Sequence, residues 1–425
     1  MRFIPPEKQR FSSLFLSAAN IQGFALSVLV LFPNVRGAGM QKSNLFSNTD
    51  PTFLLAFPIF FVSTLCVLSA KSRGFPPIGA ISRLLAMFLL FLPGVFLASW
   101  GSKSMEKICM LYTMTLLTSF APLFLLRSKK ELRYFLNWLS SIGFLIAVIG
   151  LIHGTASAGG RVSALGTNAI GFARNASIPF LWMTVLGISE SGWSLAFLFL
   201  ALIPLRAILI SGSRGPLLAS AIALFFGILA FYRKKILTPK LLFLGLVSIT
   251  ILATILMTSN LLDGLLSKRV TQFLSGKVGA SELARKDAVL KSVEILEGNP
   301  IGIGWGGFLE LGMWREGEVV PYPHNIIVEV FLEGGWIAGI WFSWLILSSF
   351  FRAFTATDNT ENRGAFILFL CFFLNALVSG DVNTNRIFSL FLGWAAREFA
   401  IRKQPKDLES NYQSYIIRRG ADEVF

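Results

Sequence analysis

Long, uninterrupted apolar runs recur along this chain from end to end, and they limit what it can fold into. Hydrophobic residues make up 54% of the 425 residues and charged residues only 14%, whereas a soluble domain carries about 25% charge. About twelve runs reach the length that crosses a bilayer. They lie near residues 11–32, 52–70, 84–100, 107–126, 134–152, 168–188, 192–210, 216–232, 240–259, 325–351, 365–380 and 383–400. This pattern is typical of a polytopic membrane protein.

The residues within these runs favour helices over strands. In lipid, every backbone polar group must be bonded within the protein, so only helices and closed barrels span the bilayer. The runs are continuously apolar rather than alternating, which argues against a barrel. We therefore predict an all-α polytopic integral membrane protein with about 12 transmembrane helices. Residues 1–425 are expected to form a single membrane domain, with a larger outer loop at 260–323 and a cytoplasmic tail at 402–425.

Lysine and arginine in the short loops predict the orientation, because cytoplasmic loops are enriched in them. With the N-terminus inside, the basic residues concentrate in the inner loops. Runs 168–188 and 192–210 are interpreted as two spans, because merging them would reverse this bias. Both termini are then cytoplasmic. Four polar features share the outer face: residues 153–175, 211–215, 260–323 and the turn at Asp381.

The net charge of +15 does not indicate a nucleic-acid partner. The basic residues are spread among short loops and form no single stripe. Topological signals and attraction to anionic membrane lipids explain this distribution better.

The outer loop 260–323 contains a predicted helical stretch, Ser281 to Leu296, followed by a glycine-dense segment from Gly298 to Gly307 that includes Gly304. Such a segment can bring backbone amides close to an anionic or sugar ligand. It can equally be a plain flexible turn, and composition alone leaves both interpretations open.

Several arginines are expected to meet at the outer face. Arg214 lies in a tight turn, Ser211-Gly212-Ser213-Arg214-Gly215-Pro216, and charges at membrane depth are costly and usually functional. The alternative is an arginine that only anchors a helix end. Arg161, Arg174 and Arg285 lie in the other outer loops. The guanidinium group binds phosphate oxygens bidentately, and no metal-binding motif accompanies these residues, so we predict a metal-free anion site.

His324 is one of only two histidines, and it stands where the long loop re-enters apolar sequence. Its ordinary pKa is about 6.5, so it can accept a proton at neutral pH. At the start of a helix, the helix dipole would disfavour its charged form. Glu329 and Glu333 follow and share one helix face. For an isolated histidine, a structural role at the helix terminus is the alternative, and we give His153 that interpretation.

The order and spacing of these motifs resemble those of the O-antigen ligase and polymerase superfamily. The resemblance is carried by Ser213-Arg214-Gly215, Arg285, Asn299-Pro300-Ile301-Gly302-Ile303-Gly304, and Pro323-His324-Asn325 through Glu333-Gly334-Gly335. Arg161 with Asn168, and more weakly Asp381, also match. The motifs cover roughly residues 155–390, and the topology covers the whole chain.

The resemblance implies a helical glycosyltransferase of the GT-C type in the bacterial inner membrane. It would transfer a glycan from undecaprenyl pyrophosphate to an acceptor hydroxyl at the periplasmic face, with inversion and without metal or cofactor. His324 would be the catalytic base, and Arg214 and Arg285 would hold the pyrophosphate, with Arg161 and Asp381 at the substrate. Asn325, Glu329, Glu333 and Gly304 would support the site.

The acceptor separates two activities within this superfamily. A ligase transfers the glycan to lipid A–core, and a polymerase transfers it to another lipid-linked glycan. We favour the ligase slightly, because the His324 segment and the loop before it resemble the ligase pattern. A lipid-linked oligosaccharide flippase or transporter is a further alternative, but it should show internal repeats. A peptidoglycan polymerase of the shape, elongation, division and sporulation class has no quotable motif here.

Overall fold

The computed structural model describes residues 18–31, 76–156, 161–189, 194–233, 280–311, 314–315, 318–319 and 322–401, and about 81% of the structure is helical. The first helices are α2 (Ala18–Leu31), α4 (Ile78–Leu90), α5 (Leu92–Phe96), α6 (Ser102–Met110), the π-helical turn η3 (Leu111–Thr115), α7 (Leu116–Leu125) and α8 (Lys129–His153). The remaining helices are α9 (Ala169–Ser189), α10 (Ser194–Ile210), α11 (Arg214–Arg233), α14 (Ala280–Gly298), α15 (Gly307–Glu310), α16 (Ile326–Thr355), α17 (Thr360–Ala376) and α18 (Arg386–Ile401). Two short hairpins pair β1 (Thr155–Ala156) with β2 (Val162–Ser163), and β3 (Trp314–Arg315) with β4 (Glu318–Val319).

The expected spans that fall on described residues coincide with helices, including the stretch predicted within the long loop, which forms α14. The expected spans 52–70 and 240–259 and the tail 402–425 lie outside the described residues, as do residues 260–279, 312–313, 316–317 and 320–321 of the loop 260–323. By length and composition, four described helical segments can cross a membrane: Ile78–Phe96, Ser102–Leu125, Lys129–His153 and Ile326–Thr355. The chain is therefore a multi-pass helical membrane protein, whereas the count of twelve spans stays a prediction.

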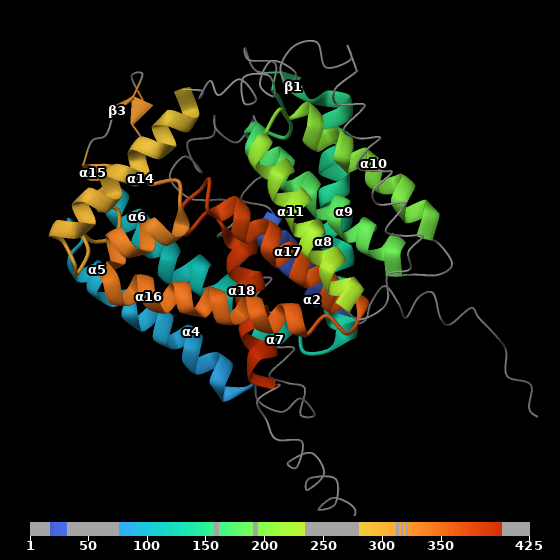
Figure 1. The fold of residues 1–425 in the computed structure, drawn as a ribbon, viewed down its shortest axis with the longest axis horizontal. Helices are drawn as coiled ribbons and strands as arrows, with labels where there is room; N and C mark the ends of the chain where they lie inside the picture. The colour runs from blue at the N-terminus through green and yellow to red at the C-terminus, as the bar shows by residue number, and fades with distance from the viewer. Residues whose placement is uncertain are drawn as a thin grey trace, which may run out of the picture.

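The helices form two groups joined by a central pair (Figure 1). On one side α4, α5, α6 and α14 surround α16, and on the other side α8, α9, α10 and α11 pack together. Helices α17 and α18 lie between the groups. Helices α9 and α10 pack closely against each other as separate elements, as expected for the two spans 168–188 and 192–210.

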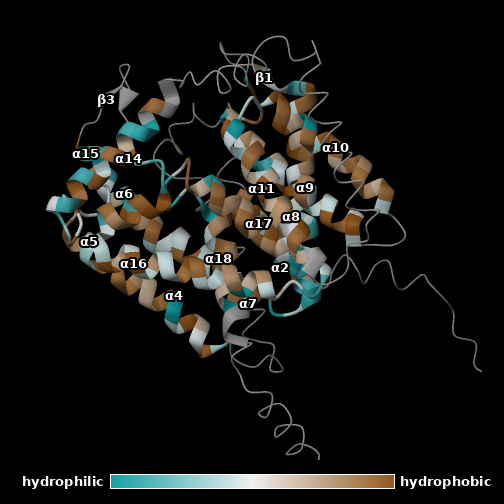
Figure 2. Cartoon of the chain, in the orientation of Figure 1, coloured by the Kyte–Doolittle hydropathy of each residue, from teal (hydrophilic) through white to brown (hydrophobic). Residues whose placement is uncertain are grey.

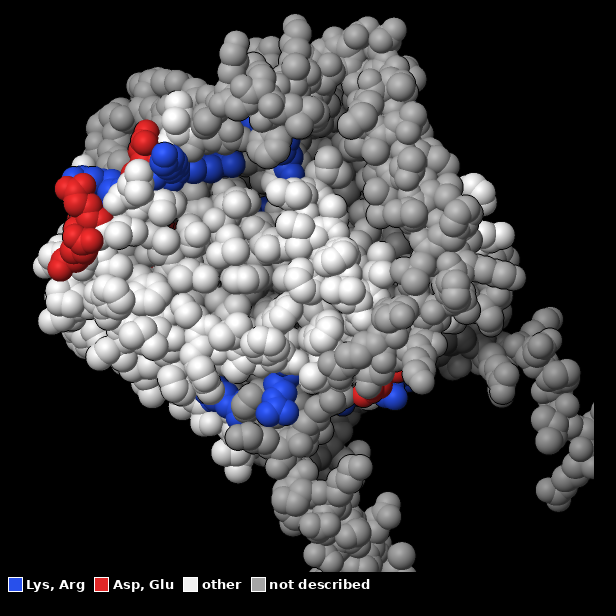
Figure 3. Space-filling view, viewed as in Figure 1, with Lys and Arg blue, Asp and Glu red and all other residues white. Residues whose placement is uncertain are grey.

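Polarity is distributed as in a membrane-embedded molecule. The helices are mainly hydrophobic along their length, with hydrophilic residues gathered toward their ends (Figure 2). On the face shown in Figure 3, the charged side chains lie in two bands separated by a broad uncharged surface. Exposed leucine, isoleucine and phenylalanine side chains on α4, α10 and α16 suit contact with lipid.

Several helix starts follow from local sequence. Ser128 and Glu131 form a reciprocal capping box at the start of α8. Asn325 and Asn359 cap α16 and α17, because the oxygen of each side chain accepts hydrogen bonds from the first amides of its helix. The cap at Asn325 sets the start of α16, and His324 lies directly before this cap.

Helix α16 is interrupted at Gly335, whose φ of 87° and ψ of 173° are not helical. The glycine-dense segment bonds to the backbone at this break: Ile303 N donates to Leu332 O at 2.9 Å, Gly304 N to Glu333 O at 3.2 Å, and Trp336 N to Pro300 O at 3.0 Å. Backbone groups freed at membrane depth need such partners. The glycine-dense segment does bring its backbone amides close to another group, as its glycines permit. That group is the backbone of α16 at the break.

Substitution of Gly335 should destabilise this crossing. A Cβ there would lie 2.3 Å from Ile301 O, and the backbone conformation is one that glycine alone adopts readily. We expect Gly335→Ala to lower stability by about 2 kcal/mol or more, seen as a lower thermal midpoint of the detergent-solubilised protein. Gly298→Ala is the control, because nothing lies within 4 Å of its added Cβ. Equal midpoints for the two variants would contradict this account of the break.

Candidate active site

Helix ends and loops from distant parts of the sequence meet at one end of the molecule. A Cβ added at Gly212 would lie 3.4 Å from Arg161 Cγ, and one at Gly215 would lie 3.5 Å from Val378 Cγ2. The turn that carries Arg214 therefore contacts both the 153–168 connection and the end of α17. The structure thus brings together three of the polar features that the sequence placed on one face.

His324 occupies an unusual position directly before the cap of α16. Its φ is 61°, in the left-handed region that a non-glycine residue seldom adopts. Its ring packs edge-on against the ring of Tyr322, with centroids 4.6 Å apart. Its Nδ1 is buried and has no hydrogen-bond partner among the residues that the structure describes. Strained backbone of this kind is concentrated at functional sites.

Burial, and then the nearby charge of Arg285, lower the pKa of His324 to about 4. The imidazole is therefore neutral at pH 7, as expected for a base. From the sequence, the dipole of the following helix is expected to disfavour the charged form, and that effect stays a prediction. Burial of the ring and the charge of Arg285 are the causes that the structure shows. Arg285 lies on α14, so the long loop supplies a charge next to the histidine.

Arg174 differs from its expected position. The sequence placed it in an outer loop, but it lies within α9. Its guanidinium donates to the carbonyls of Asn375 at 2.9 Å and Ser379 at 2.8 Å, and to Asn385 Oδ1 at 3.3 Å. It thus bonds the C-terminal end of α17 and the connection to α18. Its role in the described residues is to hold that connection in place.

Asp381 lies in this connection and is partly buried. Its Oδ1 accepts a hydrogen bond from Thr384 N at 2.7 Å, and its carbonyl accepts one from Asn385 Nδ2 at 2.7 Å. Its carboxylate interacts electrostatically with Tyr322 and Lys107. Burial, followed by the charge of Asp381, raises the pKa of Tyr322, although nearby arginines oppose this.

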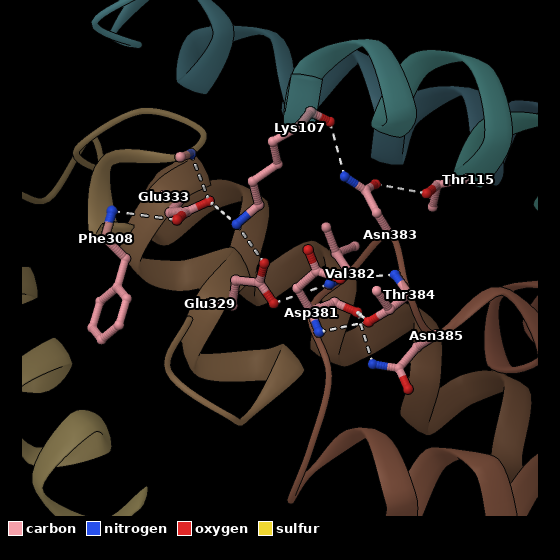
Figure 4. A network of polar contacts seen from close by, with 11 residues as sticks. Lys107, Thr115, Phe308, Glu329, Glu333, Asp381, Val382, Asn383, Thr384 and Asn385 are labelled. Atoms are coloured by element: carbon pink, nitrogen blue, oxygen red, sulfur yellow. Dashed lines mark hydrogen bonds and ion pairs between the residues drawn. The ribbon is translucent and has the colours of Figure 1, made fainter. Parts of the chain in front are cut away.

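Glu329 and Glu333 do share one helix face, and both are fully buried. Figure 4 shows Lys107 of α6 between them, with its Nζ 2.6 Å from Glu329 Oε1 and 2.6 Å from Glu333 Oε2. The sequence analysis did not single out Lys107. A signal was available, because two carboxylates on one apolar helix face need a cationic partner, but the sequence cannot say which lysine or arginine supplies it.

Arg161, Arg214 and Arg285 all lie at this end or beside His324, as the contacts above show. Arg206 lies on α10 and is exposed. Among the described residues, no group of three or more His, Cys, Asp or Glu side chains is placed to hold a metal ion. The arrangement can supply a neutral imidazole beside arginine charges, with the two buried glutamates already paired to lysine.

Residues 197–343 match the family model described as O-Antigen ligase. The resemblance to the O-antigen ligase and polymerase superfamily is confirmed. The matched segment contains Arg214, Arg285 and His324, whereas Arg161 and Asp381 lie outside it. No curated protein matches the chain. Members of this superfamily are glycosyltransferase-like enzymes, and the match supports an enzymatic role of that broad kind for this multi-pass membrane protein.

The environment of His324 predicts its titration. We expect His324 to titrate near pH 4 in the wild-type protein. Arg285→Gln should raise this pKa, because a removed positive charge no longer opposes the imidazolium. The value should stay below 6.5, since burial remains. NMR of histidine-labelled protein measures this directly, because the chain has only two histidines.

His153→Gln assigns the two signals, because it removes the other histidine. An ordinary midpoint near 6.5 for His324 in the wild type, or no upward movement in Arg285→Gln, would contradict the described surroundings of the ring.

Proposed function

We propose that this protein transfers a glycan from undecaprenyl pyrophosphate to an acceptor hydroxyl at the periplasmic face of the bacterial inner membrane. The observation that carries the proposal is the neutral, partly buried His324 beside Arg285, both within the segment that matches the O-antigen ligase family. Arg214 lies in the same segment, at the end of the molecule where α11 begins. The expected concentration of basic loops on the opposite side favours a periplasmic site.

His324 is proposed as the general base. The acceptor oxygen attacks the anomeric carbon while the imidazole takes the hydroxyl proton, and the bond to the pyrophosphate oxygen breaks with its electron pair. A group with a low pKa is a weak base. Binding of a diphosphate beside Arg285 would offset the charge that depresses the pKa of His324, so its basicity would rise when donor is bound.

Arg214 and Arg285 are proposed to bind the pyrophosphate. The leaving group carries negative charge, so it needs charge stabilisation more than a proton, and arginines supply this electrostatically. Arg161 is placed beside the Arg214 turn, where it can extend the same positive surface. Asp381 is proposed to face the substrate from the α17–α18 connection. A single displacement of this kind inverts the anomeric centre.

Removal of the base or of the charge should abolish transfer. We expect His324→Ala and Arg214→Ala to lower turnover by about 100-fold or more, measured with purified protein, a lipid-linked glycan donor and lipid A–core acceptor. His153→Ala is the matched control, because it removes the other histidine and should retain activity. Wild-type turnover in both site variants, with normal membrane insertion, would refute the assignment.

The acceptor distinguishes a ligase, which we favour, from a polymerase. In a deletion strain, loss of a ligase leaves long lipid-linked polymer that is not attached to lipid A–core. Loss of a polymerase leaves single repeats attached to the core. We expect the first pattern on a polysaccharide gel, and the second would reassign the acceptor to another lipid-linked glycan.

A further inference from the structure

The first part of α16, which follows His324, is anchored separately from the rest of the helix. The break at Gly335 divides residues 326–334 from the remainder. Across such a break, the orientation of one helical segment does not dictate that of the other. The position of His324 therefore depends on what holds residues 326–334 in place.

Lys107 is the charged group that holds this segment. Its side chain is 11% exposed, and both glutamates that it contacts are 0% exposed. Buried carboxylates are costly unless they are paired and hydrogen-bonded. One ammonium group meets this need for two successive turns of the segment, at 2.6 Å from each carboxylate.

Each glutamate also accepts a backbone hydrogen bond from a different segment. Glu329 Oε2 accepts from Val382 N at 3.0 Å, in the connection that carries Asp381. Glu333 accepts from Gly306 N at 3.1 Å, near the end of the glycine-dense segment, and from Phe308 N at 3.4 Å, just after it. The ion pairs join α6 to the first part of α16, and these hydrogen bonds join the same two glutamates to the two other segments (Figure 4).

The backbone of Lys107 adds a second link to the same connection. Its carbonyl accepts from Asn383 Nδ2 at 2.9 Å, and Asn383 Oδ1 accepts from Thr115 Oγ1 at 2.8 Å. Lys107 thus contacts the elements that carry His324 and Asp381 through both its side chain and its main chain.

We propose that Lys107 is a positioning residue that sets His324 and the Asp381 connection relative to each other by bridging Glu329 and Glu333. This inference rests on the proposed function, since it assigns the lysine a role in that reaction. Lys107 acts through the two glutamates and does not touch the reacting atoms.

The test is Lys107→Met, which keeps an unbranched chain and removes the charge. We expect kcat to fall at least about tenfold, because small misplacements of reacting groups cost rate, while KM for the lipid-linked donor changes less than about threefold. Lys103→Met is the matched control on the same helix, because Lys103 pairs with Glu106 at the surface. It should retain the wild-type kcat.

Lys107→Met also leaves two buried carboxylates without their cation, which can prevent folding. The variant Lys107→Met with Glu329→Gln and Glu333→Gln removes all three charges, and we expect it to give monodisperse protein with a thermal midpoint near that of the wild type and a kcat still reduced. Wild-type kcat in either folded variant, while His324→Ala is inactive, overturns the positioning role alone. An active His324→Ala protein would instead refute the proposed function.

Discussion

A helix that breaks inside a protein must have its freed backbone groups bonded by another part of the chain. In this molecule the break is in α16, at Gly335, and residues 300–304 supply the partners. Trp305 then extends the crossing, because its backbone amide bonds Gly94 O and its indole bonds Phe91 O. The segment formed by α4 and α5, residues 300–305 and α16 are consequently joined at one place. The site end of α16 depends on this crossing.

Around the candidate site, the buried negative charges are paired, and a positive charge lies next to His324. The two glutamates next to the break are buried and paired with Lys107. Burial of the imidazole, and then the nearby charge of Arg285, keep His324 neutral. Arg174 uses its guanidinium on carbonyls of the α17–α18 connection. Negative charge is therefore neutralised inside the protein, while positive charge stands next to the proposed base, as binding of an anionic donor requires.

Local sequence was sufficient where a property depends on nearby residues. The apolar runs predicted helices in nearly the right places, the stretch from Ser281 to Leu296 is part of α14, and the four-residue spacing of Glu329 and Glu333 put them on one face. Local sequence was not sufficient where a side chain bonds a residue that is distant in the chain. Arg174 donates to carbonyls that lie about two hundred residues later in the chain, and nothing near it in the sequence indicates these partners.

The sequence by itself determined a membrane-embedded helical chain, the order of its motifs and the scarcity of histidine, because composition and periodicity are local properties. Tertiary structure alone decided which lysine neutralises the two glutamates, why the glycines are needed and what lowers the pKa of His324. These outcomes depend on contacts between residues far apart in the chain. In a low-dielectric interior, the free-energy cost of burying a charge depends on which charged or polar group lies next to it. Only the fold brings that group to its place.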